Sequence, residues 1–432
     1  MWKNYLLGIT LLLSVQILDA QYVEPCASHQ YLNQLEEQYP GFEAANNAIF
    51  ERNHQQIGQA RDLTLLTIPV VIHIVYQNED QNISDETIEN IITSLNKDYR
   101  RLNNDANEIR SEFEMIVGDP FIEFNLAGIE RVSTNTTFQF SLFGGLPDHV
   151  KKSTEGGSDA WDNDHFLNIW VCNIEGGALL GYAYPPAGLD HWPDGASAPE
   201  SGLDGVVIHY EAFRTSGTYT TSGLLGLNEI TIPIRGRSVT HEVGHYLGLR
   251  HIWGDGTLAI LGIPDCNADD GVEDTPNQGL NSQFQCEPSL NTCNDGADDL
   301  PDMFENFMDY ALEDCQNSFT NGQIEIMRSV LENERAGLVE EMVATNDFKL
   351  EQPVVRIAPN PVNNQLFVKI AASQSGAILR LNLIDQHGRQ LENRISSNLT
   401  EEVIDVRSYP AGIYYLQAIY GDGEQMLRFV IQ

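Results

Sequence analysis

The residues best suited to chemistry form one short segment, HEVGHYLGLRH, at positions 241–251. His241 and His245 are four residues apart, so on a helix both imidazoles leave the same face and can share a zinc ion. Glu242 would lie close to the metal and stay free to act as a base. Gly248 can end the helix in a left-handed turn, which brings His251 back as a third ligand. Three protein ligands leave one zinc position open for water, as in catalytic sites.

Chance does not readily produce this pattern. From ordinary residue frequencies, HExxH alone is expected in about one chain in a hundred of this length. The added glycine and third histidine make it about a thousandfold rarer. The alternative is a buried helix whose histidines only pack, but packing does not require three histidines and a glutamate at this spacing.

The composition limits the partners. The chain has 432 residues, enough for two or more domains, and a formal net charge of -38. An acidic surface repels nucleic acid and anionic lipid headgroups, so we exclude both as main partners.

The N-terminal residues 1–20 have the form of a secretory signal peptide. Lys3 gives a positive start, residues 6–15 form an apolar run too short to span a bilayer, and Ala20 is a small residue before the cleavage point. The alternative is an N-terminal anchor that stays uncleaved. No later stretch is long and apolar enough for a membrane helix. We therefore expect no integral membrane segment in the mature chain, which is secreted or attached to the outer cell surface.

Four of the six cysteines lie in a loop-rich segment that starts at Cys266 and ends at Cys315, with Cys286 and Cys293 between them. In an exported protein such a cluster predicts two disulfides, and the sequence leaves all three pairings open. A second zinc site is the alternative, although these cysteines lack the paired spacing of structural zinc sites.

Residues 21–60 are polar and weakly patterned, and we interpret them as a propeptide rather than a domain. They contain Cys26, whose thiolate could bind the zinc ion and block it. The alternatives are a disulfide with Cys172 and an idle thiol.

The segment before the zinc motif combines strand and helix patterns. The predicted strands are 67–76, 121–132, 166–172 and 205–210. Ser84 can cap a helix whose apolar residues share one face. These elements predict a mixed, twisted sheet with helices behind it, and hence an α+β catalytic domain over 61–345. His73 and His209 lie within strands, where we expect packed or surface histidines.

An acidic loop follows the motif, with the sequence CNADDGVEDTP at 266–276. Its carboxylates and carbonyls could bind calcium, which accepts many oxygen ligands in flexible geometry, or the loop could simply be solvated. Thr320 and Gln323 have the form of a capping box and predict a helix that runs towards Val343 and closes the domain. Residues 346–355 are the expected linker.

Residues 356–432 form a separate unit that opens with turn residues. The predicted strands are 366–370, 379–384, 412–419 and 426–431. Short strands separated by turns predict a small all-β sandwich.

The long zinc motif, followed by Met308 in the sequence NFMDY at 306–310, resembles the metzincin clan of zinc proteases, in which a tight turn carrying methionine lies under the metal. More narrowly, the chain from about Arg61 to Ala344 is similar to the pappalysin family, in its ulilysin-like or cytophagalysin branch. The further motifs that carry the resemblance are TIPVVIHIVY at 67–76, DGVV at 204–207, DTP at 274–276 and FTNGQ at 319–323. The resemblance implies a zincin-like catalytic fold and a zinc-dependent endopeptidase.

The resemblance also implies a role for each matching residue. One catalytic zinc ion would be held by His241, His245 and His251. Glu242 would be the general base and acid. Tyr310 matches the tyrosine that can lean on the zinc and then assist the transition state.

Structural calcium is implied as well, with Asp270 and Thr275 as ligands and Glu273 contributing its carbonyl. The implied disulfides are Cys266 to Cys293 and Cys286 to Cys315.

Substrate preference and activation follow from the same resemblance. Asp314 matches an acidic residue at the base of the family's S1′ pocket, which implies cleavage before Arg and, less well, before Lys. The bond Ala60-Arg61 stands where a propeptide would be removed, and a cut there puts Arg61 on the P1′ side. We therefore expect self-activation at this bond. Cys26 occupies the place of the family's cysteine switch.

The tail resembles the C-terminal sorting domain of type IX secretion. The motifs that carry this are PNP at 359–361, LID at 383–385 with Gly388, and AGIY at 411–414. Such domains often end near a lysine, whereas here Arg428 stands near the end. The resemblance implies export by a sorting machinery, and an ordinary β-sandwich binding module is the alternative.

Together these patterns predict a secreted zymogen, monomeric when mature, that hydrolyses peptide bonds in proteins and peptides. One competing interpretation is a catalytically silent surface adhesin on a protease scaffold, and another is a metzincin branch with an apolar S1′ preference. The intact zinc motif argues against the adhesin, because a pseudoenzyme has no need of Glu242.

Overall fold

The computed structural model describes most of the chain between residues 25 and 431. The described ranges are 25–58, 64–141, 145–176, 179–186, 201–222, 229–255, 262–296, 299–339, 355–358, 362–370, 378–385, 389–397, 401–420 and 423–431. The predicted signal peptide, the expected cleavage point at Ala60-Arg61 and most of the predicted linker lie outside these ranges. Contacts divide the chain into two compact units, Met1–Glu340 and Glu341–Gln432.

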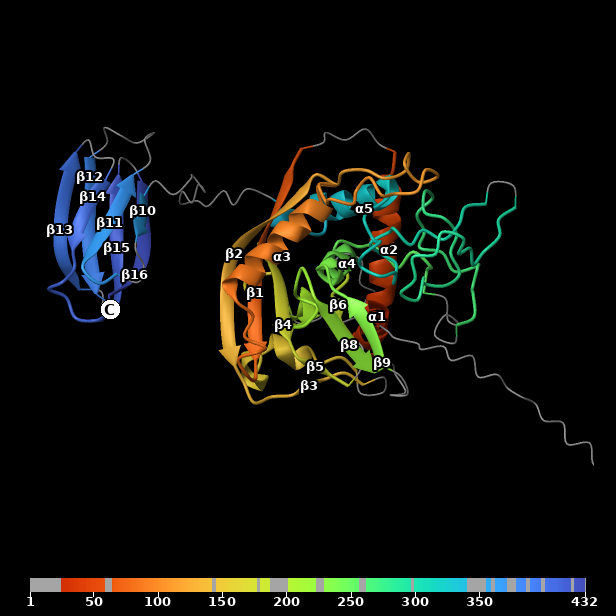
Figure 1. Cartoon of the computed structure of the whole chain (residues 1–432), viewed down its shortest axis with the longest axis horizontal. Helices are drawn as coiled ribbons and strands as arrows, with labels where there is room; N and C mark the ends of the chain where they lie inside the picture. Colours follow the sequence, from red (N-terminus) through yellow and green to blue (C-terminus); the bar gives the residue numbers. More distant parts are fainter. Residues whose placement is uncertain are drawn as a thin grey trace, which may run out of the picture. The chain divides into compact units, whose positions relative to one another are not determined.

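A five-stranded sheet runs through the first unit in the order β2-β1-β4-β7-β6 (Figure 1). Its strands are β1 (Leu66–Tyr76), β2 (Ile122–Ser133), β4 (Leu167–Cys172), β6 (Gly181–Ala183) and β7 (Val206–His209). The first four strands in this order are parallel, and β6 is antiparallel to β7 at the edge. Ile72 of β1 pairs with Ile129 on one side and Ile169 on the other. The near-continuous apolar run of β1 is therefore buried inside a mixed sheet, as predicted.

Helices α3 (Asp85–Asp98) and α4 (Arg237–Tyr246) pack against one face of this sheet. The start of α3 agrees with the prediction, because the side chain of Ser84 accepts a hydrogen bond from the Thr87 amide. In α4, Val243 is fully buried, and Leu247 just after the helix is buried with it in the same core. The core between sheet and helices thus holds the zinc-motif helix in place.

Helix α5 (Asn321–Glu332) closes the first unit and begins with the predicted capping box. The predicted run towards Val343 was wrong. The backbone leaves the helical conformation at Asn333 and continues into a short 3-10 helix, η6 (Ala336–Leu338).

Short elements cover the other face of the sheet and complete the unit. They are β3 (Phe138–Gln139), β5 (Ile174–Glu175), η1 (Asp148–Lys151), η2 (Ser153–Glu155) and η4 (Ser201–Leu203). A second apolar cluster forms here, around Trp170 of β4 and Tyr182 of β6. The antiparallel pair β8 (Thr218–Ser222) and β9 (Glu229–Pro233) lies elsewhere, with Tyr219 in the core that α3 and α4 share.

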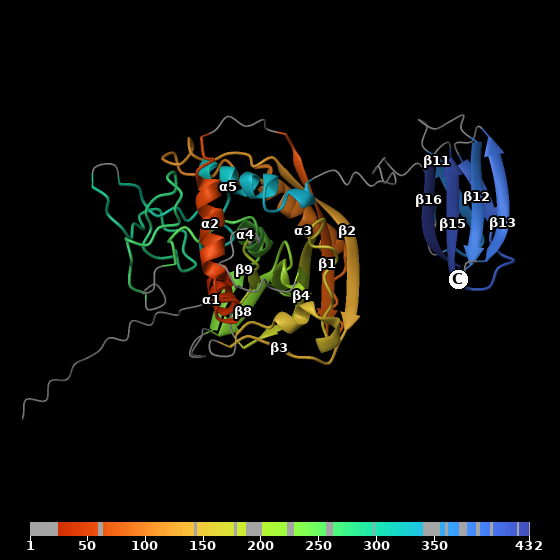
Figure 2. The ribbon, with the colours of Figure 1, turned by 180° about the vertical axis from the view of Figure 1, so that it is seen from behind.

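The N-terminal segment is more ordered than its polar sequence predicts. It forms α1 (Ser28–Gln38) and α2 (Phe42–His54), which follow each other along one side of the unit (Figures 1 and 2). Tyr31, Leu35 and Phe42 are fully buried in the second apolar cluster. The weak sequence pattern of residues 21–60 did not predict these helices, which form because a few apolar residues at helical spacing bury themselves on the catalytic unit.

The second unit is an all-β sandwich. One sheet has the order β10-β11-β14 and the other β13-β12-β15-β16. Their strands are β10 (Val355–Ala358), β11 (Gln365–Ile370), β12 (Ile378–Asp385), β13 (Gln390–Ser397), β14 (Glu401–Asp405), β15 (Gly412–Tyr420) and β16 (Gly423–Ile431). Leu366, Leu381 and Leu416 lie in its core. The sandwich was predicted, whereas β10, β13 and β14 were not.

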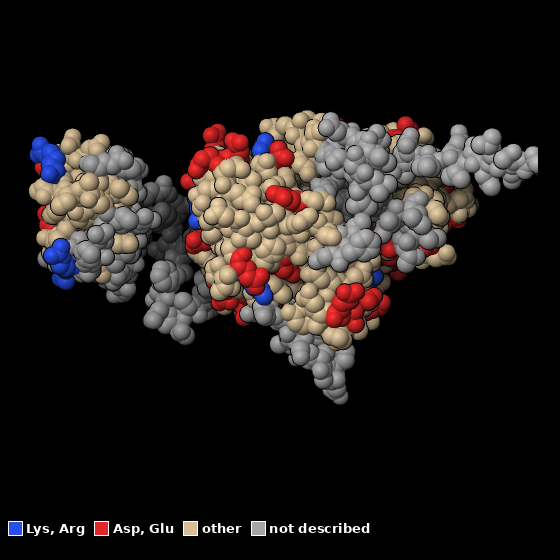
Figure 3. All heavy atoms as spheres, turned by 90° about the horizontal axis from the view of Figure 1, so that it is seen from below, with Lys and Arg blue, Asp and Glu red and all other residues tan. Residues whose placement is uncertain are grey.

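The surface agrees with the acidic composition. The face in Figure 3 carries several groups of Asp and Glu and few Lys or Arg. Among the described residues, no helix combines the length and the apolar character needed to cross a bilayer.

One close contact inside the first unit yields a prediction. A Cβ atom on Gly244 of α4 would lie 2.5 Å from Sδ of Met308, which is fully buried. Gly244→Ala is therefore expected to destabilise the first unit by about 1–3 kcal/mol, since overpacking forces neighbours apart. Chemical denaturation measures the change, and Gly202→Ala is the control, because a Cβ at Gly202 meets nothing within 4 Å. Equal stability of both variants would show that α4 and Met308 are not in contact.

Candidate active site

The three histidines of the motif converge at the end of α4. His241 and His245 project from one face of the helix, and Gly248 turns the chain with φ +92, as predicted. The turn brings His251 back, so that Nε2 of His245 lies 3.1 Å from Nε2 of His241 and 3.0 Å from Nε2 of His251. All three side chains are buried.

Hydrogen bonds at the three Nδ1 atoms orient the imidazole rings so that their Nε2 atoms face each other. Nδ1 of His241 lies 2.7 Å from the Phe307 carbonyl, and Nδ1 of His245 lies 2.9 Å from the Leu249 carbonyl. Nδ1 of His251 lies 2.6 Å from Oδ1 of Asp255. Because these oxygens only accept, each Nδ1 carries the proton and donates.

Each Nε2 of the neutral histidines is thus left with a lone pair directed at the other two. Burial, and then the neighbouring His251, lower the pKa of His241 to about 3, so its ring is neutral at pH 7. Three acceptors cannot hydrogen-bond to one another. Tetrahedral zinc with bonds of about 2.0–2.1 Å needs nitrogens about 3.3 Å apart, close to the distances here. The donor set fits a zinc ion.

The sulfur of Cys26 completes this cluster. Cys26 Sγ and one nitrogen from each histidine lie within 4.8 Å of one another. The thiol is buried and is not in a disulfide, and neither is Cys172, so the alternative of a bond between these two is wrong. Cys172 is buried in the second apolar cluster.

Glu242 faces the same space from α4. Its Oε2 accepts hydrogen bonds from Cys26 Sγ at 3.3 Å and from Ser28 Oγ at 3.0 Å. Gly181 of β6 leaves room for this side chain, because a Cβ there would lie 2.8 Å from Glu242 Cγ. The carboxylate is therefore held next to the histidines but is not one of the clustered ligand atoms.

Residues 25–28 lie along the free edge of β6. Leu180 donates its amide hydrogen to the Pro25 carbonyl at 2.7 Å, and Ala27 donates to the Gly181 carbonyl at 3.1 Å. Cys26 and Gly181 form a parallel bridge. The N-terminal segment thus adds to the sheet edge next to the histidines, which is how extended peptides commonly bind.

The segment after the histidines adds Met308 and Tyr310. Met308 lies under α4, where its Sδ takes the space beside Gly244. The Tyr310 ring centroid is 4.9 Å from that of His251, and its hydroxyl donates to the Cys26 carbonyl at 2.9 Å. Tyr310 therefore borders the metal cluster and is bonded to the N-terminal segment.

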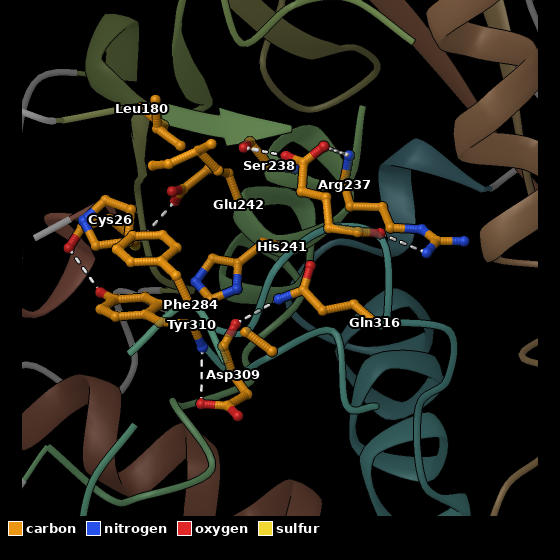
Figure 4. A pocket seen from close by; sticks show the side chains of 14 residues that line it. Cys26, Leu180, Arg237, Ser238, His241, Glu242, Phe284, Asp309, Tyr310 and Gln316 are labelled. Carbon is orange, nitrogen blue, oxygen red and sulfur yellow. Dashed lines mark hydrogen bonds between the residues drawn. The ribbon is translucent and has the colours of Figure 1, made fainter. Parts of the chain in front are cut away.

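A pocket opens beside His241 and Glu242 (Figure 4). Glu313 lines it, and its carboxylate accepts hydrogen bonds from the amides of Arg237 and Ser238 at 3.2 and 2.8 Å. These are the first residues of α4, whose N-cap Gly236 has no side chain to offer. Glu313 thus caps the zinc-motif helix and forms a wall of the pocket.

Asp314, the residue predicted at the base of the S1′ pocket, does not line this pocket. Asp314 is 45% exposed, and its Oδ1 pairs with Nε of Arg235 at 2.7 Å. Both residues lie in a turn, where adjacent side chains point in different directions, and it is Glu313 that lines the pocket.

The acidic loop has one feature that a cation would satisfy. Asp270 is 2% exposed, and its Oδ1 accepts from the Val272 amide and from Thr275 Oγ1. Its Oδ2 is buried with no hydrogen-bond partner among the described residues. Burial raises the pKa of Asp270 to about 8. Glu273 is exposed.

Two disulfides join this loop to the segment around it. They are Cys266–Cys293 and Cys286–Cys315, the pairs that the resemblance implies. The alternative of a second zinc site at these cysteines was wrong.

Sequence reasoning missed Asp255 and Glu313. Asp255 lies four residues after His251, and an acid near a third ligand is a usable signal for an orienting partner. His73 and His209 are buried within the sheet, bonded to Asn168 and Asn173, so they pack as predicted.

Comparisons with known proteins agree with this geometry. The family model described as pregnancy-associated plasma protein-A, peptidase family M43, matches residues 151–332, and the secretion system C-terminal sorting domain matches 356–432. A promirolysin point mutant from Tannerella forsythia is 34% identical, with a TM-score of 0.58 over 73% of this chain and 97% of that chain. Mature mirolysin from the same organism, in complex with a cleaved peptide, is 38% identical, with a TM-score of 0.53 over 64% and 96%.

A curated relative extends the comparison to fungi. An extracellular metalloprotease of Arthroderma benhamiae is 29% identical over 279 residues, which cover 63% of this chain and 74% of that protein. The chain therefore belongs to the pappalysin family of metzincins and is a secreted zinc metalloendopeptidase with a C-terminal secretion sorting domain.

Proposed function

We propose that the protein is made as a zymogen and that the mature enzyme cleaves peptide bonds before Arg and, less well, before Lys. The position of Cys26 carries the zymogen proposal, because its sulfur lies within 4.8 Å of a nitrogen of each histidine. A thiolate there would be a fourth ligand and would exclude the catalytic water. Residues 25–28 also occupy the edge of β6, where a substrate would bind.

Catalysis then depends on the loss of the N-terminal segment. Zinc held by His241, His245 and His251 would supply Lewis-acid chemistry, lowering the pKa of water from about 16 towards 7 and polarising the scissile carbonyl. Glu242, freed from Cys26 and Ser28, accepts the proton of the attacking water and passes it to the leaving amine.

We propose that Tyr310 helps as a hydrogen-bond donor. Its hydroxyl donates to the Cys26 carbonyl, a backbone oxygen of the N-terminal segment beside the histidines. In the mature enzyme the same hydroxyl donates to the oxyanion that develops on the substrate.

The preference for a basic residue is supported by acids beside the cleft. Glu313 lines the pocket next to Glu242, and the adjacent Asp314 already pairs with a guanidinium, that of Arg235. Carboxylates select Arg over Lys when two hydrogen bonds can form. We propose Glu313 as the residue that faces the substrate, because it lines the pocket whereas Asp314 is paired with Arg235.

We also propose one structural calcium ion at Asp270 and Thr275, with the Glu273 carbonyl as a further ligand. The unpartnered Oδ2 of Asp270 supports it, since buried carboxylate oxygens are stable when they are paired or bind a cation.

Glu242→Gln is expected to keep zinc bound and to lower kcat by about 100-fold or more, because the amide cannot accept the proton of water. Metal analysis and a peptide assay measure the two properties on the same sample. Near-normal turnover by this variant would refute the role of Glu242.

Cys26→Ala is expected to make the unprocessed chain active, about tenfold or more above the unprocessed wild type, since a lost ligand worth about 1.4 kcal/mol already gives that factor. Initial rates are measured before residues 21–60 are lost, as followed by mass spectrometry. Cys172→Ala is the control, because Cys172 is also a buried free thiol but lies away from the zinc cluster. Equal rates for both variants would contradict the cysteine switch.

Peptides that differ only in the residue after the scissile bond test the preference. We expect kcat/KM to fall from Arg to Lys to Leu, with Arg about 10- to 100-fold above Leu, the value of a charge-assisted hydrogen bond. Glu313→Gln should reduce this ratio and Asp314→Asn should leave it unchanged. A ratio that falls in Asp314→Asn but not in Glu313→Gln would show that Asp314 binds the substrate side chain. Faster cleavage before Leu than before Arg would indicate an apolar S1′ pocket.

Calcium removal at constant zinc concentration is expected to lower the melting temperature of the first unit by roughly 5 °C or more. Asp270→Asn should abolish this dependence, whereas Asp269→Asn, at an exposed position, should keep it. Calorimetry with and without calcium measures the melting temperature. A melting temperature that does not depend on calcium would rule out the ion.

A further inference from the structure

The side chain of Tyr31 fills a buried space, here called the Tyr31 cavity, although it comes from an N-terminal helix. It is fully buried, and its ring meets those of Tyr182 and Tyr184 edge-on, with centroids 5.1 and 6.0 Å away. The partners belong to the chain after residue 60. Removal of residues 21–60 therefore takes Tyr31 away, together with its neighbours Leu35 and Phe42, and leaves these two tyrosines in place.

Two charged groups lie at the end of this cavity. The Tyr31 hydroxyl donates to Oδ2 of Asp148 at 2.8 Å and accepts from Nζ of Lys151 at 3.0 Å. Lys151 is 1% exposed, and its ammonium also lies 4.7 Å from the centroid of the Tyr31 ring. The phenol is thus recognised by its hydroxyl and by its ring.

Contacts that do not involve the N-terminal segment hold this charged pair in place. Nζ of Lys151 donates to the Leu203 carbonyl at 2.8 Å and lies 3.0 Å from Oδ1 of Asp148. The Tyr182 hydroxyl donates to the same Oδ1 at 3.3 Å. The cavity therefore keeps its donor and acceptor when Tyr31 leaves, and a second phenol can regain both hydrogen bonds.

The cavity adjoins the edge where substrates bind. Tyr182 lies in β6 directly after Gly181, the residue that bridges Cys26. Tyr31 itself is only five residues from Cys26. A substrate strand that replaced residues 25–28 on this edge would run past Tyr182, which borders the cavity.

We propose that this cavity, once residues 21–60 have left, binds a tyrosine side chain of the protein substrate near the scissile bond. The proposal rests on the zymogen function proposed above and adds a class of substrate to it.

The polar end selects a neutral phenol. Phenylalanine fits the rings but leaves Asp148 and Lys151 without the hydroxyl. A phosphorylated tyrosine brings negative charge beside Asp148, where the hydroxyl of Tyr31 lies 2.8 Å from Oδ2. A site built around a hydroxyl discriminates strongly against ligands that lack it.

The test uses the full chain after it has lost residues 21–60, which intact-mass measurement establishes first. Peptide substrates with identical residues at the scissile bond carry Tyr, Phe or Ala, singly, at successive positions on both sides of it. At one position, we expect kcat/KM about tenfold higher for Tyr than for Phe, through a lower KM.

Asp148→Asn keeps the shape of the site and removes the charge that accepts the phenol proton. This variant should lose the preference for Tyr, so that kcat/KM becomes equal for the Tyr and Phe peptides. Asp164→Asn, at an exposed position, is the matched control and should keep the preference.

A second measurement needs no variant of the enzyme. The isolated peptide of residues 28–38, which lacks Cys26, should compete with the Tyr substrate about tenfold better than the same peptide with Tyr31→Phe. This holds even if Asp148→Asn fails to fold.

Two results would overturn the proposal. One is equal kcat/KM for Tyr and Phe at every position together with equal competition by the two peptides, and the other is a Tyr preference that survives in folded Asp148→Asn. If the active enzyme keeps residues 21–60, the zymogen function itself fails and the cavity stays filled. Correctly processed enzyme without a Tyr preference refutes this proposal alone.

Discussion

The site depends on three hydrogen bonds that fix the orientation of the histidine rings. The carbonyls of Phe307 and Leu249 and the carboxylate of Asp255 take the Nδ1 protons, so three Nε2 lone pairs must face each other in a buried space. Such an arrangement is repulsive without a cation, and the protein maintains it by packing α4 on the sheet and over Met308. The same packed core therefore stabilises the fold and fixes the geometry of the metal site.

The same geometry explains how one chain can hold its own cleft closed. The N-terminal segment uses the contacts that a substrate needs: the edge of β6, the Tyr310 hydroxyl, and the space beside Glu242. Helices α1 and α2 then bury apolar side chains on the catalytic unit, which anchors a segment that would otherwise dissociate. Inhibition by a covalently attached peptide needs no high intrinsic affinity, since the effective concentration is high.

Sequence patterns predicted the parts of the molecule that local rules control. The spacing of His241, His245 and Gly248 specifies a helix face and a left-handed turn, and the apolar run of β1 specifies a buried strand. The N-terminal helices were missed because Tyr31 and its few apolar neighbours gain their stability from tertiary contacts rather than from propensity. The choice between Glu313 and Asp314 depends on how one turn is oriented, which residue types do not reveal. The role of Asp255 could not be predicted either, because it depends on the path that the chain takes after His251.

The central claim is that three imidazoles hold a zinc ion that Cys26 blocks until residues 21–60 are removed. X-ray absorption at the zinc edge tests it directly, on the full chain before and after that removal. The account predicts one zinc per chain with three nitrogens at about 2.0–2.1 Å and one sulfur at about 2.3 Å, and loss of the sulfur after removal. Absence of bound zinc, or a spectrum without sulfur in the unprocessed chain, would contradict it.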